Sequence, residues 1–352
     1  MSILTRLLTR QFLGRWFGAL LALTILLQLL DLLDNATDVL ARGGGALGIL
    51  RYTLLRMPSS AERLIPLAAL IAAVLTFARL ASGSEAASLR ALGVSGHRMV
   101  ACLLPGCFVV ALAQFGMTNF LVPATQRSYA GWWASLPNAP ADEGIRVWFR
   151  AGPDVASADR VRNGGSVLDG VTIIRRDASG RVLVRHDATS ARHGAEGWQL
   201  QDVLERRAGD AGPDRLGTMA WPDAPTPRNL LAIAQPIDGV SLPELRRILD
   251  DQEEGWRGTS FYRSQVQERA AALLSALVMV LLAFPVSRIL PRRGGGSLSL
   301  GFSILSGLAF VALAGATGAL GEAGLISPAL AAWTAPVLFG YLGSVLMLHL
   351  EG

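Results

Sequence analysis

Long apolar runs alternate with short polar segments along most of this chain. Three runs carry no charged residue, and each is longer than the roughly 20 residues that a helix needs to cross about 30 Å of hydrocarbon. Three weaker apolar segments join them, so the pattern predicts six membrane-spanning helices. The predicted spans are Trp16–Leu30, Leu64–Phe77, Met99–Val122, Ala270–Ser287, Ser297–Gly321 and Ala323–Leu348.

The pattern changes between the third and fourth predicted spans. From about Ser135 to Gly258 the chain is rich in Gly, Asp, Arg and Pro, and it contains no apolar run long enough to span a membrane. Short segments alternate there with a period of two, separated by turn-forming residues, which is typical of a β-sandwich or a half-barrel. These segments are Arg146–Arg150, Val171–Arg176, Arg181–His186 and Trp198–Val203. A capping pattern then predicts a helix over Ser241–Gly255.

The fold class is therefore a polytopic α-helical membrane protein with a β-jellyroll-like domain inserted between helices 3 and 4. The expected domains are 1–134, 135–258 and 259–352. Within the β domain, strict alternation places Val171, Ile173 and Arg175 on one face, and Trp198, Leu200 and Asp202 on one face. Such faces interlock in a closed sandwich, whereas in an open jellyroll they line an apolar groove.

Composition indicates the class of protein, and the distribution of charge predicts how the chain is oriented in the membrane. The chain is 51% hydrophobic and only 17% charged, which excludes an ordinary soluble protein of 352 residues. It contains no Lys, and its 32 basic residues are all Arg. Arginines flank the spans on one side, so the positive-inside rule predicts cytoplasmic termini, a cytoplasmic loop over Ala81–Arg98 and a periplasmic β domain.

The Ala81–Arg98 loop contains a predicted helix of its own, over residues 82–93. Ser82 and Glu85 form a capping box at its start, and Gly93 supplies the stop. This helix could serve packing alone, or it could be the surface that a soluble partner grips.

No catalytic or metal-binding constellation is present in the sequence. A P-loop requires Lys, which the chain lacks. The four histidines His97, His186, His193 and His349 are scattered, and no nucleophile motif or metal-ligand spacing occurs. The predicted spans carry no deep ionisable residue of the kind that marks ion-coupled transporters. We therefore expect a permease without cofactor or metal, driven by a separate motor, and not an enzyme.

Several stretches together resemble one known family. They are Leu29–Asp34 (LLDLLD), Leu64–Ser95, Val167–Val203, Glu268–Leu274 and Leu277–Gly296. With six spans and the inserted β domain, the chain resembles, from end to end, the LptF/LptG-type permeases of the lipopolysaccharide export ABC transporter. The LLDLLD and WQLQDV segments favour the G-type.

The resemblance implies a bacterial inner-membrane complex that extracts lipopolysaccharide. Its partners would be an LptF-type permease, an LptB-type ATPase dimer that binds ATP and Mg, an LptC-type single-span protein and an LptA-type periplasmic bridge, with no nucleic acid. The 82–93 helix matches the family's coupling helix. The implied ATPase-coupling residues are Glu85, Leu89, Arg90, Leu92 and Gly93.

The resemblance also implies two substrate-binding regions. Relatives often carry basic residues near the outer end of span 1, whereas this chain has Asp31, Asp34 and Asp38, which repel phosphates. The candidates for the membrane cavity, including arginines that could compensate, are Asp31, Asp34, Arg42, Arg51, Arg56, Arg127 and Phe310. The candidates for lipid contact in the β domain are Phe149, Ile173, Val184 and Leu200.

Three alternatives stay open at this point. The chain could be the F-type paralogue, or a permease for another envelope lipid. It could also be a non-transport assembly or sensor protein, whose membrane part only anchors the β domain.

Overall fold

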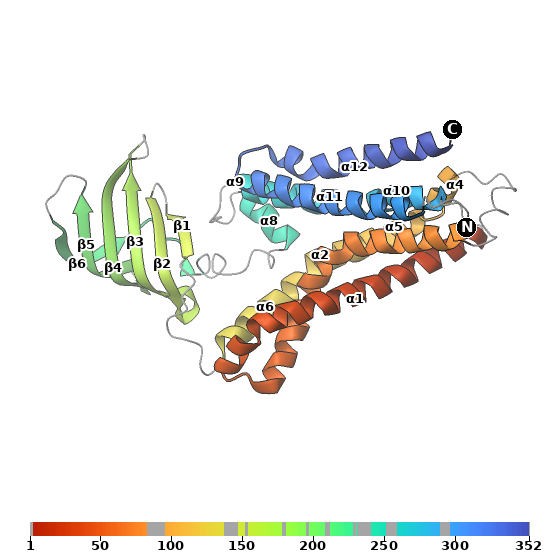
Figure 1. Cartoon of the computed structure of the whole chain (residues 1–352). Helices are drawn as coiled ribbons and strands as arrows, with labels where there is room; N and C mark the ends of the chain where they lie inside the picture. Colours follow the sequence, from red (N-terminus) through yellow and green to blue (C-terminus); the bar gives the residue numbers. More distant parts are fainter. Residues whose placement is uncertain are drawn as a thin grey trace. The chain divides into compact units, whose positions relative to one another are not determined.

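The computed structural model describes most of the chain as two compact units (Figure 1). One unit comprises Met1–Tyr129 and Ser260–Gly352, and the other comprises Ala130–Thr259, close to the predicted domain limits. The described residues are 3–82, 96–136, 147–151, 154–177, 181–194, 197–207, 212–227, 230, 241–250, 259–288 and 296–351.

The first unit is a bundle of apolar helices. Five of its helices are long and apolar enough to cross a membrane, and Ser260–Ala272 with Ser275–Val286 forms a sixth segment that is bent by 47°. The helices of the bundle are α1 (Ile3–Ala41), α2 (Gly45–Ser82), α4 (Gly96–Ala101), α5 (Leu104–Gly116), the π-helix η1 (Met117–Leu121), α6 (Val122–Ala134), α9 (Thr259–Ala272), α10 (Ser275–Ala283), the 3₁₀ helix η4 (Phe284–Arg288), α11 (Gly296–Glu322) and α12 (Pro328–Glu351).

The first two helices are much longer than the apolar runs that predicted them. α1 has 39 residues and α2 has 38, so α1 extends ~58 Å at 1.5 Å per residue. Pro58 and Pro66 lie inside α2 without ending it, because the neighbouring helices support the backbone around them. Asp31 therefore lies within a helix and faces α2.

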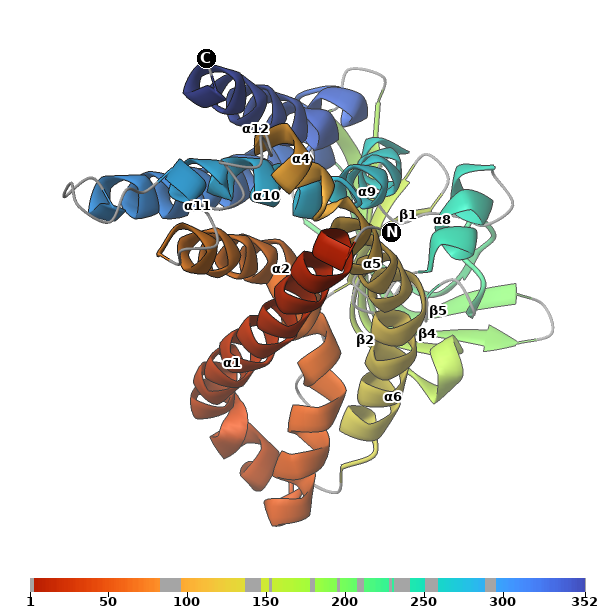
Figure 2. The same cartoon turned by 90° about the vertical axis from the view of Figure 1, so that its right-hand side faces the viewer.

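α10 is the most enclosed helix of the bundle. Seven of its nine residues are buried, and it packs against both α2 and α12; Figure 2 views the bundle along its helices. Glycines allow the close approaches: a Cβ at Gly307 would lie 2.2 Å from Leu70, and one at Gly343 would lie 2.7 Å from Leu281. Small residues at helix contacts are the expected packing device in lipid.

The second unit contains one six-stranded antiparallel sheet in the order β1-β2-β3-β4-β5-β6. A short helix, α8 (Leu242–Leu249), follows the sheet, inside the longer helix predicted there. The predicted strands are found within β1, β3, β4 and β5, whereas β2 and β6 have no counterpart among the predictions. The strands are β1 (Val147–Ala151), β2 (Asp154–Arg162), β3 (Val167–Arg176), β4 (Val182–Gly194), β5 (Gly197–Arg207) and β6 (Asp214–Trp221).

In the middle of three neighbouring strands, the alternation of inward-facing and outward-facing residues shifts by one position. Buried residues stand three apart instead of two, at Leu168 and Val171 of β3, Ala188 and Ala191 of β4, and Leu200 and Val203 of β5. Gly170 and Asp202, with φ of 61° and 53°, adopt the left-handed conformation at this row, and such irregularities bend a sheet. The predicted alternation is therefore wrong at Asp202, and Val203 takes the buried place.

This bend curls the sheet around its own core. The ring of Phe149 on β1 stacks on the ring of Trp221 on β6, with centroids 6.0 Å apart, although the two strands are at opposite ends of the sheet. The indole N–H of Trp198 donates to the carbonyl of Pro225 at 2.8 Å, which fixes the segment after β6 against the core. The described residues thus form a curled, jellyroll-like single sheet, as in the half-barrel alternative.

Candidate functional site

Polar side chains gather where α1, α2 and α6 meet. Asp31 accepts hydrogen bonds from the Tyr52 hydroxyl at 2.8 Å and from Nη2 of Arg56 at 3.4 Å. The guanidinium carbon of Arg56 also lies 6.0 Å from the ring centroid of Tyr52 and 5.6 Å from that of Tyr129. We call these four residues the α1–α2 cluster.

Helix geometry explains the α1–α2 cluster. Tyr52 and Arg56 are four residues apart in α2, so both lie on the face that packs against α1. Tyr52 is only 1% exposed; its hydroxyl donates a hydrogen bond to Asp31, and the Arg56 guanidinium neutralises the carboxylate. The carboxylate that the sequence marked as repelling phosphates is therefore offset by a neighbouring cation.

The other predicted cavity residues are not among the four residues of this cluster. Asp34, Arg51 and Arg127 are exposed, and Arg42 is buried at the turn between α1 and α2. Phe310 lies in α11, where its ring contacts that of Phe339 with centroids 5.8 Å apart. Of the predicted set, Asp31 and Arg56 are joined by a described ion pair.

An apolar cavity of about 150 Å³ adjoins the cluster between α1 and α2. It is lined by Thr24, Ile25, Gln28, Leu29, Leu32, Thr53 and Met57. Within the described part of the chain, Oγ1 of Thr24 and Nε2 of Gln28 are buried without a hydrogen-bond partner. An apolar cavity next to a charged, hydrogen-bonded group suits a molecule with a hydrocarbon part and a polar part.

A second cavity, of about 200 Å³, lies at the break between α9 and α10. Phe310, Glu268 and Ser275 line it, and the Ser275 hydroxyl donates to Oε1 of Gln114 at 3.2 Å. Oε1 of Glu268 is buried and has no partner among the residues that the structure describes.

Ionisable residues also occur in the long helices, just outside the predicted spans Leu64–Phe77 and Ala270–Ser287, and the prediction that the deep spans lack them stays a prediction. Glu62 accepts a hydrogen bond from the Thr118 hydroxyl, and Arg269 donates to Oδ1 of Asn119 at 3.2 Å. These residues lie in the parts of α2 and α9 that extend beyond the apolar runs.

The apolar lipid-contact candidates of the β domain lie on its inner face. Phe149, Ile173 and Leu200 are 2%, 2% and 0% exposed and belong to the core, whereas Val184 is half-buried. Lipid contact at the three buried positions would require the core to open, and their role stays a prediction.

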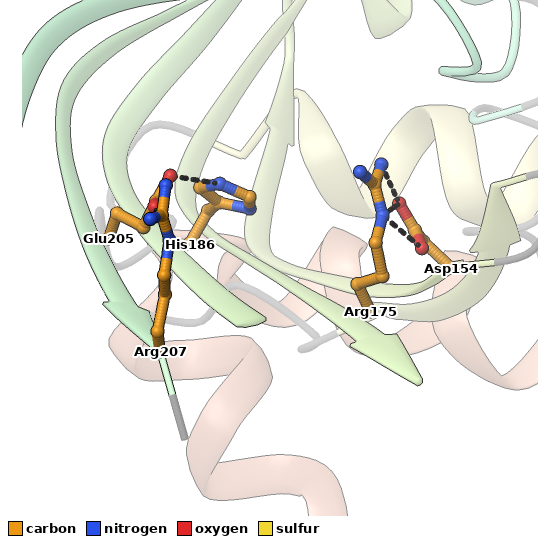
Figure 3. Close-up of polar contacts among 5 residues, drawn as sticks. All are labelled: Asp154, Arg175, His186, Glu205 and Arg207. Carbon is orange, nitrogen blue, oxygen red and sulfur yellow. Dashed lines mark hydrogen bonds and ion pairs between the residues drawn. The ribbon is translucent and has the colours of Figure 1, made fainter. Parts of the chain in front are cut away.

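Two clusters of ionisable side chains lie at one end of this inner face (Figure 3). Arg175 binds Asp154 through Nε and Nη2, the closest contact being 2.8 Å. His186 contacts Glu205 at 3.0 Å, and Nε of Arg207 contacts the same carboxylate at 2.6 Å.

These contacts shift two pKa values. The hydrogen bonds from Arg175 to Asp154 raise the pKa of Arg175. Burial acts to raise the pKa of Glu205, but the His186 hydrogen bond and the Arg207 charge outweigh it, so the pKa of Glu205 is lowered. The Glu205 carboxylate is therefore held in its charged form.

The predicted coupling residues Glu85, Leu89, Arg90, Leu92 and Gly93 lie outside the described residues. The structure ends α2 at Ser82 and begins α4 at Gly96. The coupling role of this loop stays a prediction.

Sequence reasoning missed several residues of these sites. Tyr52 and Tyr129 carry no motif, although the four-residue spacing of Tyr52 and Arg56 was visible once a helix was assumed there. Glu268 stood inside a stretch that carried the family resemblance, and His186 and Glu205 lie on different strands whose pairing the sequence does not specify.

Comparison with known proteins gives one consistent result. The family model described as lipopolysaccharide export system permease LptF/LptG matches residues 6–349. The chain is also similar to the lipopolysaccharide export system permease protein LptG of Escherichia coli strain K12, at 24% identity over 323 residues, which cover 85% of this chain and 86% of that protein. The protein of the same name from Escherichia coli O6:H1 matches equally well.

Proposed function

The chain belongs to the LptF/LptG family of lipopolysaccharide export permeases, and from that premise we propose that it is the G-type permease subunit of an ATP-driven exporter. In this proposal it pairs with an LptF-type permease above an LptB-type ATPase dimer. An LptC-type protein and an LptA-type bridge receive the lipopolysaccharide that the permeases extract from the inner membrane. The β domain lies in the periplasm, and both termini lie in the cytoplasm.

The observation that carries the proposal is the α1–α2 cluster beside its apolar cavity. Lipopolysaccharide combines acyl chains with anionic sugars, so a site for it needs apolar surface next to groups that tolerate negative charge. Arg56 removes the objection that Asp31 would repel phosphate, because its guanidinium is ion-paired with that carboxylate. The match of the family model across both units supports the same conclusion.

Reconstitution tests the proposal directly. The chain, an F-type permease, the ATPase and the LptC-type protein are placed in liposomes that contain lipopolysaccharide, and transfer to a soluble LptA-type acceptor is measured. We expect transfer that requires ATP. Failure of the ATPase to co-purify would favour the assembly or sensor alternative, and ATP hydrolysis without lipopolysaccharide transfer would favour another lipid.

Variants at Arg56 test the site itself. Arg56→Gln leaves the Asp31 carboxylate without its cation, so we expect transfer to fall several-fold, whereas Arg56→Lys keeps the charge and most of the activity. The double variant Asp31→Asn/Arg56→Gln is again neutral and should recover part of the loss. Equal transfer by all three variants would contradict a role for charge balance at this site.

A further inference from the structure

One end of the inner face of the β domain carries a row of charged side chains that the proposed function does not use. Arg175 of β3 pairs across the sheet with Val184 of β4, and Val184 pairs with Arg207 of β5. Ile173, His186 and Glu205 form the neighbouring row two residues away. Residues two apart in a strand share a face, so Arg175, Val184 and Arg207 continue the inner face beyond the buried core.

Each arginine is ion-paired with a carboxylate whose side chain is more buried than that of the arginine. The side chain of Asp154 is 3% exposed and that of its partner Arg175 is 51% exposed. The side chain of Glu205 is 11% exposed and that of Arg207 is 63% exposed. The carboxylates therefore point into the domain, and the guanidinium groups present their outer edges to solvent.

The arrangement leaves hydrogen-bond donors available. A guanidinium carries five N–H groups in a rigid fork, and the contacts described for Arg175 use only Nε and Nη2. The contact described between Arg207 and Glu205 uses Nε, so the two terminal nitrogens of Arg207 take no part in it. Arginine in a fixed orientation is the side chain best suited to bind phosphate through paired hydrogen bonds.

The spacing of the two arginines limits the ligand. Adjacent strands lie about 4.8 Å apart, so Arg175 and Arg207, on either side of Val184, are separated by about 10 Å at the backbone. Because each guanidinium is held by its carboxylate, the two side chains suit two anionic groups of one sugar unit. Val184 between them is half-buried and apolar, and it connects this end to the apolar inner face.

A further polar atom at this end lacks a partner. Nε2 of His186 contacts Glu205, and in the described part of the domain Nδ1 of the same ring is buried without any hydrogen bond. Buried polar atoms are normally paired. If the arginines served only to neutralise Asp154 and Glu205, the lack of a hydrogen bond at Nδ1 of His186 would have no explanation. The exposed N–H groups of both arginines would also have no role.

We propose that Arg175 and Arg207, on either side of Val184, form a binding site for phosphate groups on the sugar portion of an amphiphilic glycolipid, whose hydrocarbon portion would lie along the inner face. The proposal rests on the proposed function, because that function brings a phosphorylated glycolipid to this domain. The shared chemistry is a phosphate monoester, which free inorganic phosphate also presents.

Direct binding to the full-length chain in lipid nanodiscs tests the site without the ATPase. The probes are a bisphosphorylated glucosamine disaccharide without acyl chains and inorganic phosphate, titrated by calorimetry. Arg207→Gln removes one arginine and leaves Glu205 with His186. Its matched control is Arg206→Gln, the adjacent exposed residue of β5 on the opposite face.

We expect Arg207→Gln to raise the Kd of the disaccharide about tenfold or more, since hydrogen bonds to charged groups contribute about 1.5–3 kcal/mol each. Arg206→Gln should change it less than about twofold. Because Arg175→Gln would leave the buried Asp154 unpaired, Arg175→Lys and the neutral pair Asp154→Asn/Arg175→Gln replace it. Both should weaken binding while thermal unfolding shows a folded domain.

Several outcomes would overturn the proposal. Equal weakening by Arg206→Gln would mean general attraction to a basic surface. Inorganic phosphate binding as tightly as the disaccharide would mean a free-anion site, and absence of binding by the unaltered chain would mean purely structural ion pairs. The proposed function fails separately, if the reconstituted complex with the unaltered chain moves no lipopolysaccharide.

Discussion

Closure of the β core by Phe149 and Trp221 predicts how strongly the domain resists lipid entry. The two stacked rings join the first and last strands of the sheet, and both side chains are at most 5% exposed. Replacing a buried aromatic residue by Ala costs about 3–5 kcal/mol. Trp221→Ala removes this contact from the closed state, so it should raise the population of an opened inner face by about a hundredfold to several thousandfold.

The same magnitude sets the burial energy that a lipid must supply to open the core. Removing a methylene group from water contributes about 0.8 kcal/mol, so burial of roughly four to six methylenes offsets the loss of the Phe149–Trp221 contact. One acyl chain is long enough to supply them. We therefore expect the closed core to open when lipid is present and to close when it leaves.

Photo-crosslinking measures this opening. A photoreactive amino acid at Leu200, which is 0% exposed, should capture lipopolysaccharide weakly in the unaltered chain and several-fold more strongly when combined with Trp221→Ala. Trp221→Phe keeps an aromatic ring against Phe149 and serves as the control, with capture near the unaltered level. Equal capture in all three proteins, with the domain folded by limited proteolysis, would refute an opening core.

Three further predictions concern coupling, topology and pH. Glu85→Ala or Glu85→Arg should reduce recovery of the ATPase in a pull-down, whereas the Ser88→Ala control should not; unchanged recovery would exclude the coupling role. A cysteine at Asp177 should react with a membrane-impermeant thiol reagent in intact spheroplasts, and labelling only after lysis would reverse the topology. Pairing lowers the pKa of Glu205, so its stabilising contribution is complete above the ordinary value of 4.5 and is lost as the pH falls below it. Thermal unfolding should show a smaller loss between neutral and acidic pH for Glu205→Gln, and identical pH profiles would contradict the assignment.

The architecture was predictable because it depends on long apolar runs. The runs of α11 and α12 are uninterrupted, and they predicted these helices nearly to their ends. α1 and α2 were underestimated, since their outer turns are amphipathic and contain Asp31, Arg51 and Arg56. Hydrophobicity alone registers only the part of a helix that lipid surrounds, whereas contact between two helices can extend both beyond it.

The sites were less predictable because they depend on tertiary contacts. Asp31 looked like an unpaired carboxylate until the hairpin of α1 and α2 brought Tyr52 and Arg56 against it. In the β domain, alternation placed Ile173 correctly, but it failed at Asp202, where the left-handed backbone shifts the inward phase. No local pattern announces such a shift, because Asp is common both in turns and at exposed strand positions.

The one-residue shift that neighbouring strands share at Gly170 and Asp202 has an evolutionary consequence. Beyond Gly170 and Asp202, every inward residue of β3 and β5 depends on that one-residue offset. A single-residue insertion or deletion in one strand would turn its remaining apolar side chains toward water, so strands can lengthen or shorten freely only at their ends. Among homologues that have diverged as far as 24% identity, we therefore expect the residue count between these two positions to vary only in the β3–β4 and β4–β5 loops.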